Sequence, residues 1–447
     1  MNPEKIANDV LNEDLVKKIS ALKSEPQWML DKRLEALRLY KETPMPDFAM
    51  DLSDIDKQVI NYYVDSKFLM TDDWNSLDFS VKNIASSIGI KDDMKNELSG
   101  FGFQYDSNVV FGNLKKELEL KGVIFESLDT ALKKYPELVK KYFMNECVSI
   151  NLHKFSMLHA ALWSGGTFIY VPSGVVVDKP LHSYFRMQQK NSGQFEHTLI
   201  IAEEGSKISY IEGCSNPMDS SLSLHCGCVE IFVEKSAVVK YSSIENWSRN
   251  VYNLNTKRAI VYDNASIEWL NGNMGSCATM LYPTSVLLGN NSKSESLGIA
   301  FAEYGQYHDI GSNVIHIGKN TSSIIRSKSI SLKGGKNVYR GLIKICKNAV
   351  NAKSYVECDS LLLDCESVSF AYPKVDVREK KSLLSHEAKI GKISSEMIYY
   401  LMSRGFNEDR AKEMIIGGFV NPLLKKLPLE YAAELNRLID LRMDGHM

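Results

Sequence analysis

Two cysteines and a histidine are the residues whose types and spacing could do chemistry in this 447-residue chain. Cys214 stands in YIEGCSNP, Cys358 stands in VECDSLLLD, and the two are 144 residues apart. His386 follows Cys358 by 28 residues and is followed directly by Glu387. A thiolate attacks sulfur or binds metals, and a thiolate beside an imidazole can hold a metal ion or an iron–sulfur cluster. Whether these side chains meet depends on the fold.

An internal repeat indicates the fold that must position them. Six segments carry an apolar strand, then a Gly, Asn or Ser followed by a small residue, and then a second strand of alternating character. The small residues, which we call markers, are Ser206, Ala237, Ala265, Ser292, Thr321 and Ala349. Their spacings are 31, 28, 27, 29 and 28 residues. A nearly fixed period of this length, built from short strands, indicates a β-helix.

The period converts sequence separation into distance. If one period is one coil, adjacent coils are about 4.8 Å apart. Cys214 and Cys358 have nearly the same phase and lie about five coils apart, so roughly 24 Å should separate them, too far to share a disulfide or a metal. His386 should lie on the coil next to Cys358, about 5 Å away, where both could bind one metal or cluster. Glu387 should point to the opposite face unless the strand bends or ends there.

Each candidate thiol also has a purely structural interpretation. Free cysteines are often simply buried, so Cys358 gains its interest from His386. Cys214 follows Gly213 at an expected coil corner, where exposure would favour a reactive thiol. The four cysteines without an obvious partner are expected to be structural, namely Cys147, Cys277, Cys346 and Cys365.

Further candidates lie within strand-like sequence. The segment HCGC holds His225, Cys226 and Cys228, and its two thiols share one face of a strand. This group could bind a metal, but a packed coil interior is the favoured interpretation. Arg186 and Lys257 are charges in strands, where most such side chains face solvent and an inward one needs a polar or anionic partner.

The chain is expected to be mainly β and to have three parts. These are a mostly helical N-terminal domain over residues 1–148, a parallel β-helix over 149–390 and a helical C-terminal domain over 391–447. Solenoid ends need such caps because a terminal coil exposes an unpaired edge. Within the ends, FGNLKKELELKG is expected to be helical, and Gly405 and the Gly417-Gly418 pair are expected to interrupt the C-terminal helices.

Composition and charge exclude several functional classes. Hydrophobic residues make up 44% and charged residues 24%, with a net charge of −2, as in an ordinary globular protein. No polybasic block suggests nucleic acid as a partner, and no apolar run reaches the roughly 20 residues of a membrane span. The N-terminus resembles neither a signal nor a transit peptide, so a cytoplasmic location with reduced thiols is expected. No GxxxxGK[ST] motif is present, so the chain is not expected to carry its own P-loop ATPase.

Long segments resemble the SufB branch of the SufB/SufD family, whose members assemble iron–sulfur clusters. The resemblance runs roughly from residue 20 to 445 and includes EPQWMLDKRLEALRLY, WSGGTFIYVPSGV, YIEGCSNP, YRGLIKI and HEAKIGKISSEMIYYLMSRG. It implies a right-handed parallel β-helix flanked by helical domains, and a scaffold rather than a classical enzyme. It also implies that Cys214 accepts persulfide sulfur from a cysteine desulfurase system. Cys358, with His386 or Glu387, would then ligate a nascent [4Fe–4S] or [2Fe–2S] cluster.

The resemblance implies partners as well. Arg186 and Lys257 match residues that line an interior sulfur path. The C-terminal helices would dock a SufC-type ABC ATPase, a SufD paralogue or a second copy of the chain would complete the complex, and apo-proteins would receive the cluster. A reduced flavin could supply electrons. Two departures stand out: Ser385 replaces the acidic residue that precedes the His-Glu pair in some members, and an N-terminal CxxCxxxC motif is absent.

Two other functions are compatible with a β-helix. A SufD-like subunit would stabilise the same complex without receiving sulfur, and the YIEGC thiol argues against it. A carbohydrate-active β-helix enzyme would need clustered Asp, Arg and Lys on one exposed face, and no such cluster is visible.

Overall fold

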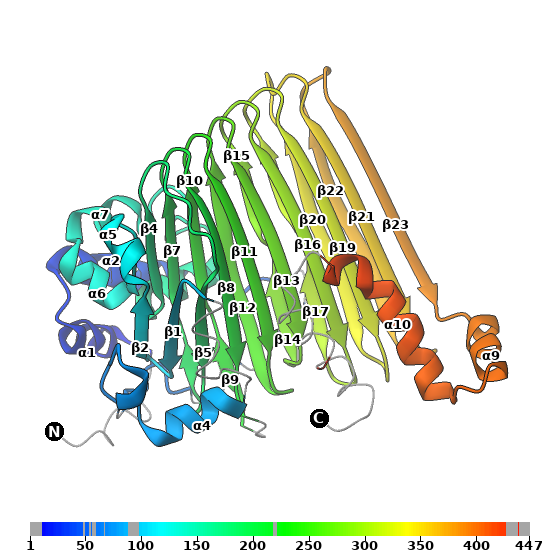
Figure 1. The fold of residues 1–447 in the computed structure, drawn as a ribbon, viewed down its shortest axis with the longest axis horizontal. Coiled ribbons are helices and arrows are strands. Elements are labelled where there is room, and N and C mark those ends of the chain that lie inside the picture. The colour runs from blue at the N-terminus through cyan, green and yellow to red at the C-terminus, as the bar shows by residue number, and fades with distance from the viewer. Residues whose placement is uncertain are drawn as a thin grey trace.

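The computed structural model describes residues 11–47, 50–52, 55, 60–66, 68–87, 98–217, 221–425 and 437. The described chain forms a β-solenoid of about eight turns with helices at both ends, as the sequence predicted (Figure 1). Among the described helices, none combines the length and the hydropathy needed to cross a membrane.

Two long sheets form the walls of the solenoid. In spatial order, the strands of the ten-stranded sheet are β2 (Asn108–Leu114), β1 (Gly100–Tyr105), β5 (Leu181–Arg186), β8 (Lys207–Ser215), β11 (Val238–Asn246), β13 (Ser266–Met274), β16 (Lys293–Ala302), β19 (Ser322–Ser331), β21 (Lys353–Leu362) and β23 (Leu383–Lys392). From β1 to β23 every neighbouring pair is parallel. Each residue in the paired part of a strand therefore has an aligned partner on the next coil.

The second sheet lies on the other side of the interior, and most of its strands are shorter. Along its main path these are β14 (Ala278–Leu281), β17 (Tyr307–Ile310), β20 (Lys336–Ile345), β18 (Asn313–His316), β15 (Thr284–Leu287), β12 (Val251–Val261), β10 (Cys228–Val233), β7 (His197–Ala202), β4 (Thr167–Val171) and β3 (Ile124–Ser127). The strands β22 (Val368–Val377), β6 (Gly193–Gln194) and β9 (Ser223–His225) pair with members of this sheet.

The marker residues mark the tight corners of the coils. Each follows a residue with positive φ, such as Gly205 at 71° or Asn264 at 58°, a conformation that Gly and Asn adopt at low cost. All six markers are fully buried, because only a small side chain fits inside the corner. One marker was wrong: Ser322 aligns with Lys353, so Ala352 and not Ala349 corresponds to Thr321. This coil has a longer loop, which the regular period did not reveal.

Helices cover the N-terminal end of the solenoid. They are α1 (Glu13–Lys23), α2 (Gln27–Glu42), η2 (Trp74–Ser76), α4 (Phe79–Ser87), α5 (Lys116–Leu120), α6 (Leu128–Lys134), α7 (Pro136–Tyr142) and α8 (Lys154–Leu162). The prediction of a helix throughout FGNLKKELELKG was wrong, because its first residues belong to β2, which pairs with β1. The partner strand overrides the helical spacing of that segment.

At the C-terminal end, the described residues include two helices. Helix α10 (Glu408–Leu424) packs Ile416 and Val420 on the outer face of the ten-stranded sheet. It passes through Gly417-Gly418 without a break, against the prediction, because this packing holds it. Gly405, with φ 97°, does separate it from α9 (Ser395–Ser403). None of the residues of α9 is buried.

Candidate functional site

Cys358 and His386 meet at the C-terminal end of the solenoid. They lie on β21 and β23, the last two strands of the ten-stranded sheet. His386 aligns with Val356, two residues from Cys358, and so shares its inward face. The Cys358 Sγ and the His386 Nε2 are 3.8 Å apart. The prediction that these residues lie on adjacent coils is confirmed.

The surroundings of this pair keep both side chains neutral. Cys358 is buried, and burial raises the pKa of its thiol to about 12, although a hydrogen bond from Tyr339 acts in the other direction. Partial burial lowers the pKa of His386. A neutral imidazole can bind a metal directly, whereas the thiol must first release its proton. A cation bound here would therefore favour the Cys358 thiolate.

Glu387 does not join the pair. Strand β23 is regular at this point, so Glu387 aligns with Glu357 and points to the opposite face from His386. Its carboxylate forms an ion pair with Lys389, with 2.7 Å between Oε1 and Nζ. The bend that would have turned Glu387 inward is absent from this strand.

Cys214 lies inside the solenoid and not at an exposed corner. It belongs to β8, is only 1% exposed, and packs against Phe185, Met187, Trp247 and Val251. Burial, followed by the nearby carboxylate groups, raises the pKa of its thiol well above the usual value. The expectation of an exposed thiol was wrong because β8 continues past Gly213 to Ser215.

The predicted separation of the two thiols agrees with the sheet order. Four strands, β11, β13, β16 and β19, lie between β8 and β21. Five strand spacings correspond to about 24 Å. Cys214 and Cys358 therefore occupy separate sites on the same inward face.

Lys257 points into the solenoid interior. Its positive charge has an anionic partner there, as the sequence analysis expected of an inward charge. It is 2% exposed, and its Nζ lies 2.7 Å from Glu245 Oε1 and 2.8 Å from Ser243 Oγ. Burial disfavours the ammonium, but Glu245 and Glu212 outweigh burial and raise the pKa of Lys257. The charge is thus retained in the interior.

Arg186 is not part of this interior group. It follows Phe185 in β5, so it points to the opposite face from the side chain that packs on Cys214. Its guanidinium donates to Ser215 Oγ at 2.8 Å, and burial lowers its pKa. The structure therefore brings Lys257, and not Arg186, to the inward side.

Sequence analysis missed most of the interior polar group. Glu196, Cys214 and His225 each offer an atom within 4.8 Å of the others, and all three are buried. His225 is hydrogen-bonded to Glu196 and, at 2.7 Å, to Asn253 Oδ1. Asn253 in turn donates to Glu245 at 2.6 Å. The alternation of side chains along a strand could have revealed this group. In YIEGC and SSIEN, the acidic residue falls on the same face as the apolar residues that are buried.

Two aligned rows of inward residues run between the thiols. One row consists of Glu212, Ser243, Asn271, Gly298, Ser327 and Cys358. The neighbouring row consists of Cys214, Glu245, Asn273, Ala300, Ser329 and Ser360. Apart from the residues near Cys214, the members are small or amide-bearing side chains, so neither row contains a large apolar side chain.

A small cavity interrupts the packing halfway along these rows. Asn271, Asn273, Gly298 and Ser327 line one side of it, and Leu281, Pro283, Ile310, Gly311 and Ser312 line the other. It offers about 10 Å³ to the centre of a water-sized sphere, which is about the space of one water molecule. Between the two thiols the interior therefore has a small cavity with polar groups on the side of the two rows and mostly apolar groups on the facing side.

Comparisons with known proteins agree with this arrangement. A sequence profile described as "SUF system FeS cluster assembly, SufBD core domain" matches residues 185–419, and one described as "SufBD protein N-terminal region" matches residues 102–182. An "Iron-sulfur cluster assembly SufBD family protein" of Staphylococcus epidermidis is 48% identical over 435 residues, 97% of this chain and 93% of the relative. A Staphylococcus aureus protein of the same family has the same identity and coverage. These matches show that the chain belongs to the SufBD family of iron–sulfur cluster assembly proteins.

Proposed function

We propose that the chain is the SufB-like scaffold of a Suf complex, which accepts sulfur at Cys214 and builds a nascent iron–sulfur cluster at Cys358. The observation that carries this proposal is the pairing of Cys358 with His386, 3.8 Å apart on the last two coils. A thiolate and an imidazole at an open end can hold iron while leaving positions for sulfide and for a partner's ligands.

Sulfur would enter by transpersulfidation. The Cys214 thiolate attacks the outer sulfur of a donor persulfide, an S–S bond forms at Cys214, and the donor's S–S bond breaks to release its thiolate. The thiol proton passes to the donor thiolate, with the adjacent Glu196–His225 pair as the nearest proton carrier. Since Cys214 is buried, this step requires the surrounding chain to open.

The two inward rows are the proposed route from Cys214 to Cys358. Lys257 would attract an anionic sulfur species at the start of the route, since its ammonium faces the interior. The cavity beside Gly298 lies midway, and the hydroxyl groups of Ser327 and Ser329 follow it. Arg186, on the other face, would act only on the outer side of β8.

The open end would be completed by a partner, either a SufD-type paralogue or a second copy of the chain. Within the described residues, β23 pairs only with β21 and ends the ten-stranded sheet. Leu383 is 67% exposed, and Phe370, Tyr372 and Ile390 are also exposed. Such an edge accepts a strand from another chain. Glu387, directed outward, could reach a cluster only after a rearrangement of β23.

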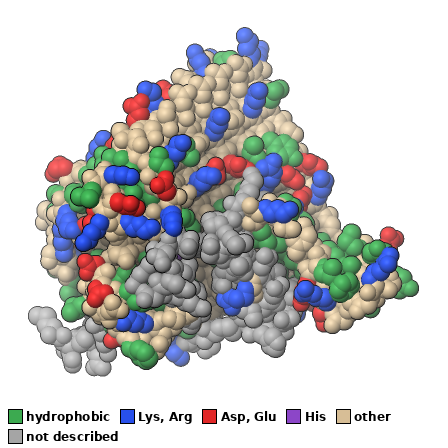
Figure 2. All heavy atoms as spheres, in the orientation of Figure 1, with side chains coloured by type: hydrophobic (Ala, Val, Ile, Leu, Met, Phe, Trp, Pro, Cys, Tyr) green, Lys and Arg blue, Asp and Glu red, His purple; other side chains and the backbone are tan. Residues whose placement is uncertain are grey.

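The C-terminal helices would dock the ABC ATPase. Figure 2 shows hydrophobic side chains gathered over the α9 end of the molecule. Met397, Tyr399, Tyr400 and Met402 of α9 are exposed, as is Phe406 just after it. An exposed apolar group of this kind is typical of a protein interface. Within the predicted helical C-terminal domain, the segment PLEYAAELNRLIDLRM lies largely outside the described residues.

Anaerobic reconstitution with iron, sulfide and reductant tests the scaffold role. The wild type should develop the visible absorbance and Mössbauer spectrum of a cluster, and Cys358→Ala should not. Cys365→Ala is the matched control, because Cys365 is exposed and lies only seven residues further along the chain. A cluster of wild-type yield in Cys358→Ala would refute the assignment.

A SufD-like role is the second candidate, because the family assignment covers both branches. Persulfide labelling of Cys214 in the assembled complex separates them. Labelling that disappears in Cys214→Ala supports the scaffold role. An unlabelled Cys214 in a complex that still makes clusters would favour the structural subunit.

A further inference from the structure

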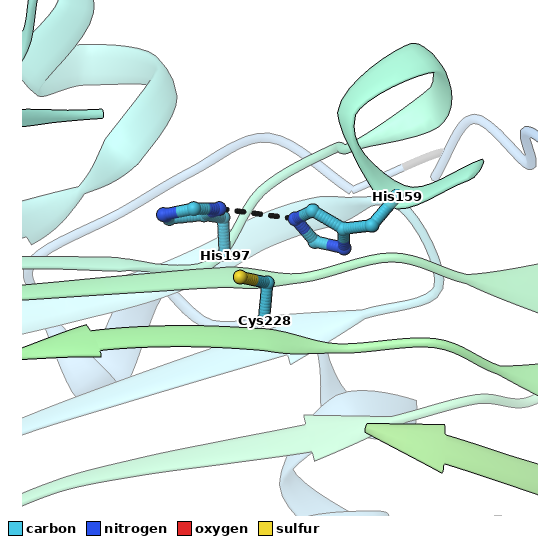
Figure 3. A group of neighbouring side chains, drawn as sticks. All are labelled: His159, His197 and Cys228. Atoms are coloured by element: carbon cyan, nitrogen blue, oxygen red, sulfur yellow. Dashed lines mark hydrogen bonds between the residues drawn. The ribbon is translucent and has the colours of Figure 1, made fainter. Parts of the chain in front are cut away.

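A second group of ligand atoms lies outside the solenoid interior, where the N-terminal helices cover the shorter-stranded sheet. His197 on β7 and Cys228 on β10 are aligned partners in neighbouring parallel strands. His159 reaches them from α8, as Figure 3 shows. One atom of each side chain lies within 4.8 Å of the other two, and all three residues are at most 1% exposed.

The outer nitrogen of each imidazole lies beside an oxygen atom. His159 Nδ1 lies 2.7 Å from the carbonyl oxygen of Cys226, which can only accept, so this nitrogen carries the proton. His197 Nε2 lies 3.1 Å from Glu230 Oε2, although the geometry of this contact is not that of a hydrogen bond. Glu230 also accepts the backbone N–H groups of Met144 and Val148, at 2.6 and 2.8 Å. A hydrogen bond such as that of His159 Nδ1 orients the histidines that bind metals.

The inner nitrogens of the two imidazoles face each other. His159 Nε2 and His197 Nδ1 are 3.0 Å apart (Figure 3). At this separation a proton or a cation must lie between them, because two facing lone pairs repel. Zinc–nitrogen bonds in a tetrahedral site hold two such nitrogens about 3.3 Å apart. The observed separation needs only a small adjustment.

We propose that His159, His197 and Cys228 form a structural transition-metal site that fastens α8 to the solenoid. Two imidazoles and a thiolate suit Zn²⁺ or another borderline-soft cation, and they do not suit Mg²⁺ or Ca²⁺, which prefer oxygen ligands. Because the ligands come from a helix and two strands, a bound ion cross-links the N-terminal helices to the coils they cover. The site shares no residue with the proposed cluster site.

Cys226 has a different surrounding, although it belongs to the same HCGC segment. Its Sγ lies 3.5 Å from the carbonyl oxygen of Phe155 and is not one of the three clustered ligands. The interpretation that this pair packs in the coil interior was wrong, because both thiols lie under the N-terminal helices: Cys226 is a buried, packed thiol there, while Cys228 lies among potential ligands. Cys226 provides a matched control for a buried thiol.

A proton offers the competing arrangement. If Glu230 were protonated, it could donate to His197 Nε2, and His197 Nδ1–H could donate to His159 Nε2. The three residues would then form a hydrogen-bonded chain that needs no metal. Metal binding distinguishes the two arrangements, since the chain has no vacant position for an ion.

Cobalt binding to the full-length protein tests the site. The background is Cys214→Ala with Cys358→Ala, which removes the thiols of the proposed sulfur route, and the protein is first stripped with a chelator. We expect one equivalent of Co²⁺ with a sulfur-to-cobalt charge-transfer band, displaced by Zn²⁺. Adding Cys228→Ala should remove the band, while Cys226→Ala should keep it. His197→Gln should weaken cobalt binding at least about tenfold.

Thermal unfolding keeps the test informative if a variant folds poorly. Zn²⁺ should raise the Tm of the stripped, otherwise wild-type protein, because an ion that binds only the folded state stabilises it. Absence of stoichiometric cobalt binding in the folded background would overturn the proposal. So would a charge-transfer band that survives Cys228→Ala.

Discussion

Cys214 and Cys358 share one inward face of the same sheet, yet the central coils and the terminal coil around them are built differently. Around Cys214, buried ionisable side chains are paired with one another in the interior of the solenoid: Lys257 faces Glu245, and His225 is paired with Glu196. Around Cys358, the last coil leaves apolar side chains such as Leu383 exposed. The comparison teaches that the buried polar groups around Cys214 find their partners within one chain, whereas the exposed apolar side chains around Cys358 are suited to contact another chain.

Blocking the route between the two regions should have the largest effect on function. A side chain added at Gly298 would fill the central cavity, with its Cβ 3.7 Å from Ser327 Oγ. We expect Gly298→Val to slow cluster formation from persulfide sulfur roughly tenfold or more. Free sulfide should still support reconstitution, because it need not travel from Cys214.

Gly391→Val is the control for that variant. Gly391 lies in β23, and an added Cβ there meets nothing within 4 Å. It should leave both reactions unchanged. Equal rates for Gly298→Val and the wild type with persulfide sulfur would exclude this route.

Removing one charge from the closed centre should have the largest effect on stability. Lys257→Met leaves Glu245 buried without its cation, at a cost of about 3–5 kcal/mol in the free energy of unfolding. Lys240→Met removes an exposed partner of Glu268 and should cost less than about 1 kcal/mol. Urea unfolding measures both changes. A double variant, Lys257→Met with Glu245→Gln, should recover part of the loss.

The same buried ion pair also predicts a dependence of stability on pH. Lys257 lowers the pKa of Glu245 from its ordinary 4.5 even though burial acts in the other direction. A lowered carboxyl pKa contributes stability above pH 4.5 that is lost as pH falls through the folded-state value. The raised pKa of Lys257 contributes stability below pH 10.5 that is lost at higher pH.

The wild type should therefore lose more stability than the double variant when the pH falls below about 4.5. Urea unfolding at a series of pH values checks this expectation. Parallel curves for the two proteins would show that the pair does not set the acid limit.

The smallest effect is expected at the coil corners. Ser236 and Asn351 both have positive φ, at 60° and 62°, so a valine at either position should cost about 1–2 kcal/mol. Ser236→Val should destabilise the central coils, and Ser236→Gly should not. Asn351→Val should mainly increase hydrogen exchange in β21 and β23. If both valine substitutions lowered the global free energy of unfolding equally, the terminal coil would not unfold independently of the central coils.

The coil spacing and the partnership of Cys358 with His386 could be predicted because the repeat converts sequence into distance. The burial of Cys214 could not, since it depends on how far β8 extends past Gly213. The inward position of Lys257 became clear only from the structure, in which Lys257 on one sheet bonds to Glu245 on the facing sheet. The family assignment decides against the carbohydrate-active alternative. The proximity of His159 to Cys228 could not be predicted, because His159 lies on a helix 69 residues earlier, outside the strand repeat that relates sequence separation to distance.

The edge strand β23 has a thermodynamic consequence. In a solenoid each coil is held by its neighbours, and the last coil of the described chain has β21 on one side only. It should therefore fray at a lower free energy than any central coil. His386 lies on this strand and Cys358 on the next, so fraying would loosen one ligand while the other stays anchored. A cluster held there could be handed on by local unfolding, without opening the body of the solenoid.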